Sequence, residues 1–535
     1  MRKRLILSAQ RPLVGGPDAS DSGKRRVGRR GWRSWQAGVG GVGNWGTNLL
    51  LRMQRFNIGL PKLITRPIRS FLLGLTKDVI TRRGVEDWST PLIVGRDVRL
   101  SQATAGAASG VSEANIPSLA VIGSRCSASL PGRPSSDQES GNHCQAGVGL
   151  RCLLVTGSLD VGGMEEVVVF LARRLPQYGV RTAVMHSSDK GAPDGAPTGR
   201  LGRLLMAEGI ETVDLAGAAG ARWVKGWRPD VISAHDAAPW VLEAATSLSI
   251  PYVDTLHGLP SLLERDRAAE AERGKRLARV VAVSALERRR YLKVNPAFPP
   301  ERIVTIPNGV DDWRRVTGDR ERARARWGIG DEYVFVSLAR HGLQKNTYGL
   351  VAAFEDVAAD HPEAHLVIAG RPDDTAYFAQ VVRLRGSLAC RDRIHLRDHT
   401  PNPSELLALA DGFVLDSFFE GWSLASMEAL HAGLPVVLSE VGGARDQVGP
   451  DGEHGYVVPN PLGDPVRVNR DRMRKVRFAR QVNHAALVHA MSSLIINRAS
   501  YLAARPRLIK DSASRFHPDV CLRSHVHVLA AAASL

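Results

Sequence analysis

The chain has 535 residues, of which 44% are hydrophobic and 23% are charged. This is ordinary globular usage, and it excludes a collagen-like, coiled-coil or wholly disordered protein. At ~100–200 residues per domain the length allows three or four folded units at most. No apolar run reaches the ~18 residues needed to cross a bilayer, so we expect no integral membrane anchor. The five cysteines show no C-x-x-C spacing, which indicates isolated thiols in a reducing compartment.

The formal net charge of +17 is concentrated at the N-terminus. Residues 1–149 hold 22 Lys and Arg against 9 Asp and Glu, a charge of +13, which leaves only +4 for residues 150–535. A strongly basic protein invites the hypothesis of nucleic-acid binding. Because the charge belongs to the N-terminal segment, we expect no nucleic-acid partner for the folded part.

Residues 1–149 differ in composition from the rest of the chain. Segment 103–141 is rich in Ser, Ala, Gly and Pro and buries too little apolar surface to offset chain entropy. We therefore predict a basic, low-complexity and poorly ordered extension. Segment 54–77 is both apolar and basic and also suits a short amphipathic helix on an anionic membrane. The Arg-rich, acid-poor start fits a transit peptide as well, and these interpretations remain open.

From residue 150 onward, short β-rich runs alternate with helical stretches. This alternation predicts parallel sheets with right-handed crossovers. About 300 residues of it are too many for one core. We therefore predict an α/β protein with two Rossmann-like, doubly wound domains facing a cleft, at 150–315 and 316–460, followed by a helical segment, 461–535, that packs back on the first domain. The expected strands are 152–156, 181–186, 231–234, 252–256, 280–283 and 303–306, then 334–338, 365–369, 393–396, 412–415 and 435–438.

Ligands of open α/β sheets bind beyond the carboxyl ends of the strands, and the stretch FEGWSLASMEALHAGLPVV follows the strand expected at 412–415. Ser423 suits a helix N-cap, and the free N–H groups of the helix that begins at Leu424 form an anion site. Gly421 permits close approach of a ligand. Glu420 precedes the helix and Glu428 lies about one and a half turns inside it, so the two carboxylates can reach different parts of one extended ligand.

This stretch resembles the E-x7-E signature of the retaining glycosyltransferases of family 4, which have the GT-B fold. Other segments resemble the family's motifs in the family's order. They are LLVT at 153–156, GGME at 162–165, YVDTLHG at 252–258, VAVS at 281–284, IVTIPNGV at 303–310, SLARHGLQKN at 337–346, LVIAG at 366–370 and SEVGG at 439–443. The resemblance covers residues 151–460. Besides His431, which stands where a small or apolar residue is common, three positions depart from the pattern: Ala339 and Asn346 replace glycines of the donor-phosphate loop, and Asp446 stands where a glutamate is usual.

The resemblance implies a donor site in the second domain. Arg340 and Lys345 would meet the diphosphate of a nucleotide sugar with fixed positive charge, Arg by planar hydrogen bonding and Lys as a point charge. Glu428 would accept hydrogen bonds from the two ribose hydroxyls. The remaining donor-binding positions are Gly163, Gly421, Ser423 and Leu424.

Two residues are predicted as catalytic. Glu420 would bind the hydroxyls of the donor sugar, where a carboxylate can also stabilise an oxocarbenium-like centre. His257 ends a strand of the first domain and would hold the sugar or the acceptor. His235 ends a neighbouring strand and is a weaker candidate for the same cleft. No nucleophile–base pair is evident from spacing, in agreement with the same-face attack that the resemblance implies.

We find no D-x-D motif after a strand, and the pairs at 311–312 and 373–374 lie in predicted turns. The resemblance implies a retaining hexosyltransferase, and together with the missing motif it implies that no metal or other cofactor is needed. The enzyme would transfer a hexose from a nucleotide diphosphate sugar to a saccharide or lipid-linked acceptor in polysaccharide, glycolipid or glycoconjugate synthesis. We expect a cytoplasmic location, with peripheral contact of the N-terminal segment with the inner face of a membrane.

A nucleotide-sugar epimerase of GT-B architecture and a non-catalytic nucleotide-sugar-binding protein are the alternatives. The sequence leaves open the base and sugar of the donor, the acceptor and the oligomeric state.

Overall fold

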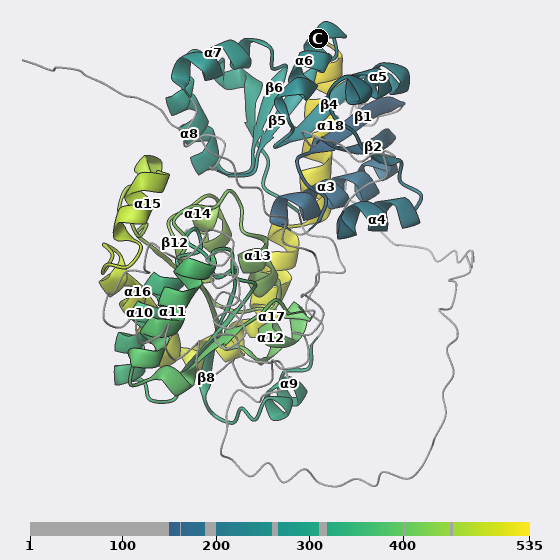
Figure 1. Ribbon diagram of the computed structural model, residues 1–535. Helices are drawn as coiled ribbons and strands as arrows, with labels where there is room; N and C mark the ends of the chain where they lie inside the picture. Colours follow the sequence, from purple (N-terminus) through teal and green to yellow (C-terminus); the bar gives the residue numbers. More distant parts are fainter. Residues whose placement is uncertain are drawn as a thin grey trace, which may run out of the picture. The chain divides into compact units, whose positions relative to one another are not determined.

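The computed structural model describes residues 149–160, 162–187, 199–258, 266–309, 318–400, 402–449 and 453–535. The predicted basic extension, including segment 54–77, lies outside the described residues apart from Gly149. The described part contains two parallel sheets, each flanked by helices (Figure 1). Within these ranges, no helix combines the length and apolar character that a bilayer crossing requires.

The first sheet has seven parallel strands in the order β3-β2-β1-β4-β5-β6-β7. Because the strand order reverses between β1 and β4, a switch point lies there, where doubly wound sheets bind ligands. The strands are β1 (Leu150–Thr156), β2 (Val180–His186), β3 (Thr212–Asp214), β4 (Val231–His235), β5 (Tyr252–Leu256), β6 (Arg279–Ala282) and β7 (Ile303–Thr305). The helices are α3 (Gly163–Arg174), α4 (Arg200–Ala207), α5 (Gly217–Trp227), α6 (Pro239–Ser247), α7 (Arg267–Lys275) and α8 (Ala285–Val294), with short 3-10 turns η1 (Leu175–Tyr178) and η2 (Pro300–Arg302).

The second sheet has six parallel strands in the order β10-β9-β8-β11-β12-β13. Its strands are β8 (Tyr333–Leu338), β9 (Ala364–Ala369), β10 (Ile394–Arg397), β11 (Gly412–Leu415), β12 (Val436–Ser439) and β13 (Gly455–Val458). Its helices are α9 (Arg320–Arg326), α10 (Thr347–Asp360), α11 (Thr375–Ser387), α12 (Pro403–Leu409), α13 (Leu424–His431) and α14 (Ala444–Val448), with η4 (Arg391–Arg393). Two parallel, doubly wound sheets confirm the predicted fold class.

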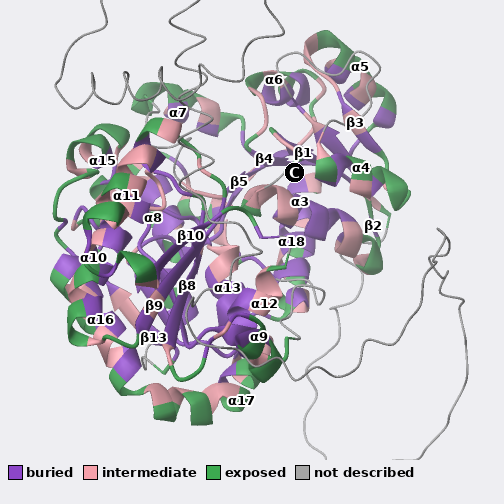
Figure 2. Cartoon of the chain, turned by 60° about the horizontal axis from the view of Figure 1, so that its bottom comes forward, coloured by how far each residue is buried: buried purple, intermediate pink, exposed green. Residues whose placement is uncertain are grey.

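Both sheets are covered by helices on their two faces, which explains their uninterrupted apolar strands. In β8, for example, Val334, Phe335 and Val336 are all at most 1% exposed although alternate residues point to opposite faces. Figure 2 shows the same strand, with β9 and β10, as buried. Neither β3 nor β13 was predicted from the sequence. Each is only three or four residues long and lies at an edge of its sheet, so its sequence carries little periodicity.

The C-terminal residues form η5 (Pro465–Arg467), α15 (Arg470–Val476), α16 (His484–Ile496), α17 (Arg498–Arg515) and α18 (Pro518–Ala533). Helix α16 packs on α10 and helix α17 on α13, both in the second domain. Helix α18 instead packs on β4 and β5 of the first sheet (Figure 1). Its Leu522 and Leu529 are at most 1% exposed in a core cluster shared with Leu171 of α3. The end of the described chain therefore belongs to the core of the first domain.

A buried acidic residue ties two connecting helices to the amino-terminal edge of the second sheet. Asp411, which precedes β11, accepts hydrogen bonds from Arg320 at 2.5 Å, from Arg324 at 3.0 Å and from Arg498 at 3.1 Å. The first two arginines belong to α9 and the third begins α17. Since the carboxylate is 1% exposed, its charge is stabilised by these partners rather than by water.

Candidate active site

The loop that follows β8 carries both predicted donor cations. Lys345 Nζ donates to Glu420 Oε1 at 2.6 Å, and the two side chains are only 15% and 10% exposed. Arg340 Nη1 donates to Asp373 Oδ1 at 2.9 Å, and its side chain is 47% exposed. The structure thus brings Lys345 together with the predicted sugar-binding carboxylate, while Arg340 pairs with an acid that we did not select.

Gln344 connects this loop to the loop that follows β11. The backbone N–H of Phe418 donates to the carbonyl of Gln344 at 2.9 Å, and Gln344 Nε2 donates to the carbonyl of Phe419 at 3.2 Å. Arg340 Nη2 donates to Gln344 Oε1 at 3.4 Å. Lys345 is therefore bonded directly to the loop that carries Glu420, whereas Arg340 is connected to that loop through Gln344.

Helix α13 begins as the sequence predicts. Ser423 is the N-cap, and its side chain accepts a hydrogen bond from the N–H of Ser426 at 3.2 Å. Gln447 of α14 braces the same turn by donating to the carbonyl of Ser423 at 2.9 Å. Glu428 lies on the helix and is 8% exposed. The remaining N–H groups of the first turn, with the positive end of the helix dipole, can receive an anion.

Gly421 lies where loops from the two domains meet. A Cβ at this position would overlap the carbonyl oxygen of His257, so only glycine fits without a shift. Gly442, in the loop after β12, has φ +42° and would overlap the carbonyl of Gly421 in the same way. A Cβ at Gly163 would lie 3.7 Å from Leu424, an ordinary contact. These predicted donor-binding positions are therefore neighbours across the two domains.

The half-buried His257 belongs to a histidine cluster in the first domain whose other members, His235 and His525, are buried. Its Nε2 lies 2.6 Å from Nδ1 of His235, whose Nε2 lies 3.1 Å from the hydroxyl of Ser233. Burial lowers the pKa of His257 to about 3, and the nearby His525 of α18 adds to this effect. Burial also lowers the pKa of His235 well below its usual value and that of His525 to about 4. The cluster is uncharged at neutral pH, so His257 can offer a hydrogen bond but not a positive charge.

The three departures from the family pattern have a structural account. Asn346 adopts the left-handed conformation, with φ 52°, which asparagine tolerates better than most residues. Ala339 is buried and its N–H donates to the carbonyl of Ala369 at 3.0 Å. Asp446 lies in α14, where burial raises its pKa and Arg289 of the first domain opposes the rise. Asn346 therefore adopts a backbone conformation that is also accessible to the glycine it replaces.

Metal ligands do not gather in the part of the chain that the structure describes, where no three His, Cys, Asp or Glu side chains form a group suited to an ion. The cations that the site offers are Arg340 and Lys345.

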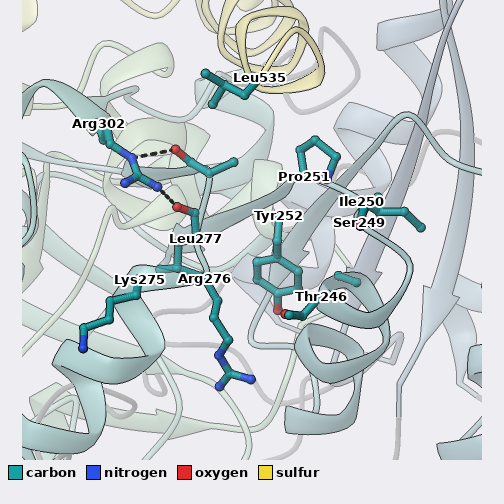
Figure 3. Close-up of a pocket in the computed structure, with 12 residues that line it drawn as sticks. Thr246, Ser249, Ile250, Pro251, Tyr252, Lys275, Arg276, Leu277, Arg302 and Leu535 are labelled. Carbon is teal, nitrogen blue, oxygen red and sulfur yellow. Dashed lines mark hydrogen bonds between the residues drawn. The ribbon is translucent and has the colours of Figure 1, made fainter.

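A separate hollow of about 330 Å³ lies at the opposite, amino-terminal end of the first sheet (Figure 3). Its lining includes Tyr252 at the start of β5 and Arg302 just before β7. Arg302 donates to the carbonyls of Leu277 and Ala278, as the dashed lines in Figure 3 show. Because the predicted chemistry lies at the carboxyl ends of the strands, this hollow is no part of the candidate active site.

Sequence reasoning missed several residues around the site. Asp373 follows β9 and pairs with Arg340. Its place shortly after a predicted strand is the sequence feature that could have indicated it as a site residue. His525 comes close to His235 and His257 through the fold alone, since α18 is the last helix described. No local pattern marks such a residue.

Two family models match the chain. One is described as "Glycosyltransferase Family 4" and matches residues 161–314, and the other, "Glycosyl transferases group 1", matches residues 319–468. A D-inositol 3-phosphate glycosyltransferase of Geodermatophilus obscurus is 30% identical over 346 residues, which are 56% of this chain and 75% of the relative.

Solved structures share the architecture. Sucrose-phosphate synthase of Thermosynechococcus elongatus superposes with a TM-score of 0.54 at 18% identity, over 70% of this chain and 97% of that one. Anabaena Alr3699/HepE, solved in complex with UDP and glucose, superposes with a TM-score of 0.50 at 18% identity, over 68% of this chain and all of that one. At these identities the likeness concerns the fold alone.

Proposed function

The chain belongs to the GT-B glycosyltransferases of family 4, and from this premise we propose that it transfers a hexose, with retention of configuration, from a nucleotide diphosphate sugar to an acceptor hydroxyl. The observation that carries the proposal is the Lys345–Glu420 ion pair, formed at 2.6 Å beside the start of α13. It joins a cation suited to a diphosphate with a carboxylate suited to a sugar. Anabaena Alr3699/HepE, whose fold is similar, was solved with UDP and glucose, which supports a donor of this class.

Binding of the donor would replace the acidic partners of Lys345 and Arg340 with the diphosphate. An incoming diphosphate offers Lys345 and Arg340 more negative charge than the carboxylates of Glu420 and Asp373 do. Glu420, once released from Lys345, is free to accept hydrogen bonds from sugar hydroxyls. Because the pair is largely buried, the electrostatic effect of the cation on the leaving group is stronger than it would be in water.

The reaction needs no protein nucleophile. The acceptor oxygen attacks the anomeric carbon on the face that the diphosphate leaves, and the electron pair of the broken C–O bond goes to the diphosphate. The proton of the acceptor hydroxyl then moves to a leaving phosphate oxygen. The helix N-terminus at Leu424 and the two cations stabilise the charge that grows on the diphosphate, without a metal ion.

We assign the acceptor to the first domain, where His257 lies next to Gly421 and is uncharged. The neutral His257 can donate to or accept from a hydroxyl without competing for the diphosphate. The acceptor class is a saccharide or lipid-linked sugar. The relative from Geodermatophilus obscurus carries D-inositol 3-phosphate in its name, so a polyol acceptor belongs in the test.

The proposal also includes a cytoplasmic location, with peripheral membrane contact through the N-terminal segment. The described cysteines, Cys152, Cys390 and Cys521, are free and buried, and free thiols are typical of a reducing compartment. Flotation of the full chain with anionic vesicles, compared with a variant lacking residues 1–149, tests the membrane contact.

A donor screen tests the function. The purified protein is incubated with UDP-glucose, UDP-galactose, UDP-N-acetylglucosamine and GDP-mannose, each with and without a mixture of saccharide and inositol phosphate acceptors, and nucleotide release is measured. We expect release that depends on both a donor and an acceptor and that Lys345→Ala lowers by ~10²–10³-fold. Lys475→Ala, an exposed lysine of α15, is the control and should leave the rate unchanged.

Two outcomes would replace the proposal. Conversion of the donor sugar to its epimer without acceptor would establish the epimerase alternative. Tight binding of nucleotide without turnover of any donor would establish the non-catalytic one. An anomeric configuration in the product opposite to that of the donor, read from the NMR coupling of the new linkage, would contradict retention.

A further inference from the structure

A cluster of buried polar side chains lies behind the ion pair of the donor site, and the proposed function uses none of them. The cluster, called here the amide network, consists of Asn346, Asp416, Gln481 and Asn483. Their exposed fractions are 0%, 1%, 8% and 1%. A buried polar group without a hydrogen-bond partner destabilises the folded state. These four side chains therefore need specific hydrogen-bond partners.

The bonds of the network are short and reciprocal. Asn346 Nδ2 donates to Asp416 Oδ2 at 2.7 Å and to Gln481 Oε1 at 2.6 Å, and Gln481 Nε2 donates back to Asn346 Oδ1 at 2.8 Å. Asn483 Nδ2 donates to the other carboxylate oxygen of Asp416 at 2.6 Å. Among the described residues, Oδ1 of Asn483 is the one polar side-chain atom of the network without a partner.

The network joins the two loops of the donor site at their bases. Asn346 directly follows Lys345 and immediately precedes α10, and Asp416 is the first residue after β11. The carboxylate of Asp416 thus stands four residues before Glu420 along the second loop. Gln481 and Asn483, just before α16, close the network from a third segment. A change in any one member would alter the spacing between the two loops.

A helical glycine makes room for the network. A Cβ at Gly349, in α10, would overlap Oε1 of Gln481 and crowd the amide of Asn346. An alanine there would force the two amides apart, although it changes no polar atom. The position therefore offers a purely steric way to disturb the network.

The charge of Asp416 depends on its amide partners. Burial raises its pKa to about 7, and the hydrogen bonds from Asn483 and Asn346 oppose the rise. Loss of an amide donor would favour the protonated acid, which accepts one hydrogen bond fewer.

We propose that the amide network positions Lys345 against Glu420, so that cation and carboxylate meet at the diphosphate end of the donor site. Its members are positioning residues: they touch the two loops and act through them. The expected effect of the network on donor turnover rests on the proposed function, whereas its effect on the geometry of the two loops does not.

Three variants of the protein that alter the hydrogen bond between Asn346 and Asp416 test the proposal. Asn346→Asp places two carboxylates against each other, and Asp416→Asn leaves one oxygen for the two amides that donate to Asp416, so that one of them faces an NH2 group. The double variant Asn346→Asp with Asp416→Asn restores the bond with donor and acceptor exchanged. Coupled neighbours behave non-additively, so a positioning role predicts that the double variant is less impaired than either single one.

Hydrogen–deuterium exchange of the ligand-free protein provides the first measurement. We expect each single variant to raise exchange about tenfold in peptides covering 340–346 and 416–424, with peptides of β8 and β12 unchanged and the double variant close to wild type. Gly349→Ala should reproduce the effect, and Gly386→Ala is its control because nothing lies within 4 Å of a Cβ there. Unchanged exchange in both loops for all variants would overturn the proposal, whichever donor the enzyme uses.

Kinetics provide the second measurement, with the donor that the screen identifies. A positioning role predicts that the KM for the donor rises about tenfold in the single variants, returns in the double variant, and leaves the KM for the acceptor unchanged. A fall in the amount of active enzyme with both KM values unchanged would show a merely structural role and would overturn the proposal. If wild-type enzyme turns over no donor, the proposed function fails, while the exchange measurement still decides whether the network positions the loops.

Discussion

The two domains present different chemistry at the carboxyl ends of their sheets. In the second domain the loops are charged and are bonded to one another, as in the Lys345–Glu420 pair and the link from Gln344 to Phe419. In the first domain the groups nearest the donor loops are the uncharged histidines His235 and His257 and the glycines at 162–163, while an acidic side chain, Asp214, pairs with His186 at the ends of β2 and β3. A diphosphate requires fixed positive charge, whereas a hydroxyl acceptor requires only hydrogen bonds. The contrast therefore agrees with the proposed division between donor and acceptor.

The charged groups of the second domain also differ between the two ends of its sheet. At the amino-terminal edge, Asp411 and its arginines satisfy one another and leave no free charge on the buried carboxylate. At the carboxyl edge, the predicted donor cations Arg340 and Lys345 pair with Asp373 and Glu420, which the proposed donor would displace. The following changes test this comparison, in order of decreasing expected effect.

The largest effect should come from the amino-terminal edge. Asp411→Asn removes a buried charge that three arginines share, and we expect the free energy of unfolding to fall by about 3 kcal/mol. Urea denaturation followed by circular dichroism measures this. Glu453→Gln, which removes an exposed pair with Arg507, is the control and should change stability by less than about 0.5 kcal/mol. A change in the donor KM of folded Asp411→Asn protein would contradict the separation between the two edges.

A change at the junction of the domains should come next. Gly421→Ala adds a Cβ that overlaps the carbonyl of His257, so the loops must move apart. We expect transfer to fall by ~10²-fold, the typical cost of misplacing reacting groups by an ångström, while the circular dichroism spectrum stays unchanged. Gly226→Ala is the control, because a Cβ there meets nothing within 4 Å. Full activity in Gly421→Ala would show that this contact is not required for transfer.

A smaller effect should follow from His257→Gln. Loss of one hydrogen bond to a sugar predicts a fall in kcat/KM of about tenfold. Because the pKa of His257 is lowered to about 3, its imidazole is already neutral above that pH and gains no charge between pH 5 and 9. The kcat/KM of the wild type and of His257→Gln should therefore depend on pH in the same way over this range. Disappearance of a limb near pH 6.5 in the variant would assign a charged role to this residue.

The smallest effect should come from metal chelation. If Arg340 and Lys345 supply the positive charge that the diphosphate needs, dialysis against EDTA should leave the transfer rate within about twofold of its value in Mg²⁺. Initial rates with and without EDTA measure this. A loss of activity that Mg²⁺ or Mn²⁺ restores would contradict the proposal that the donor site works without a metal.

The sequence predicted the architecture well because strand–helix alternation and uninterrupted apolar strands are local patterns. The four-residue strand β11 begins and ends where expected, and the helix α13 begins where expected, since Ser423 marks its start in the sequence itself. The recognised family and the assignment to the glycosyltransferases are confirmed as well. The roles of the individual site residues stay predictions.

Sequence reasoning could not foresee which distant segments meet. It noted Asn346 as a departure from a glycine, but not that its amide bonds to Asp416, 70 residues away, and to Gln481, 135 residues away. It selected Lys345 and Glu420 for separate roles, but not as an ion pair. Nor did it place His525 of α18 beside the histidines of the first domain.

By itself, the sequence determined most of the strands, the two sheets, the start of α13 and residue types suited to a diphosphate donor, because these depend on periodicity and short motifs. The tertiary structure alone decided the partners of each charge, the neutral state of the histidines and the bonds behind the donor loop. These depend on burial and on contacts between segments far apart in the chain, and neither is encoded in any local pattern.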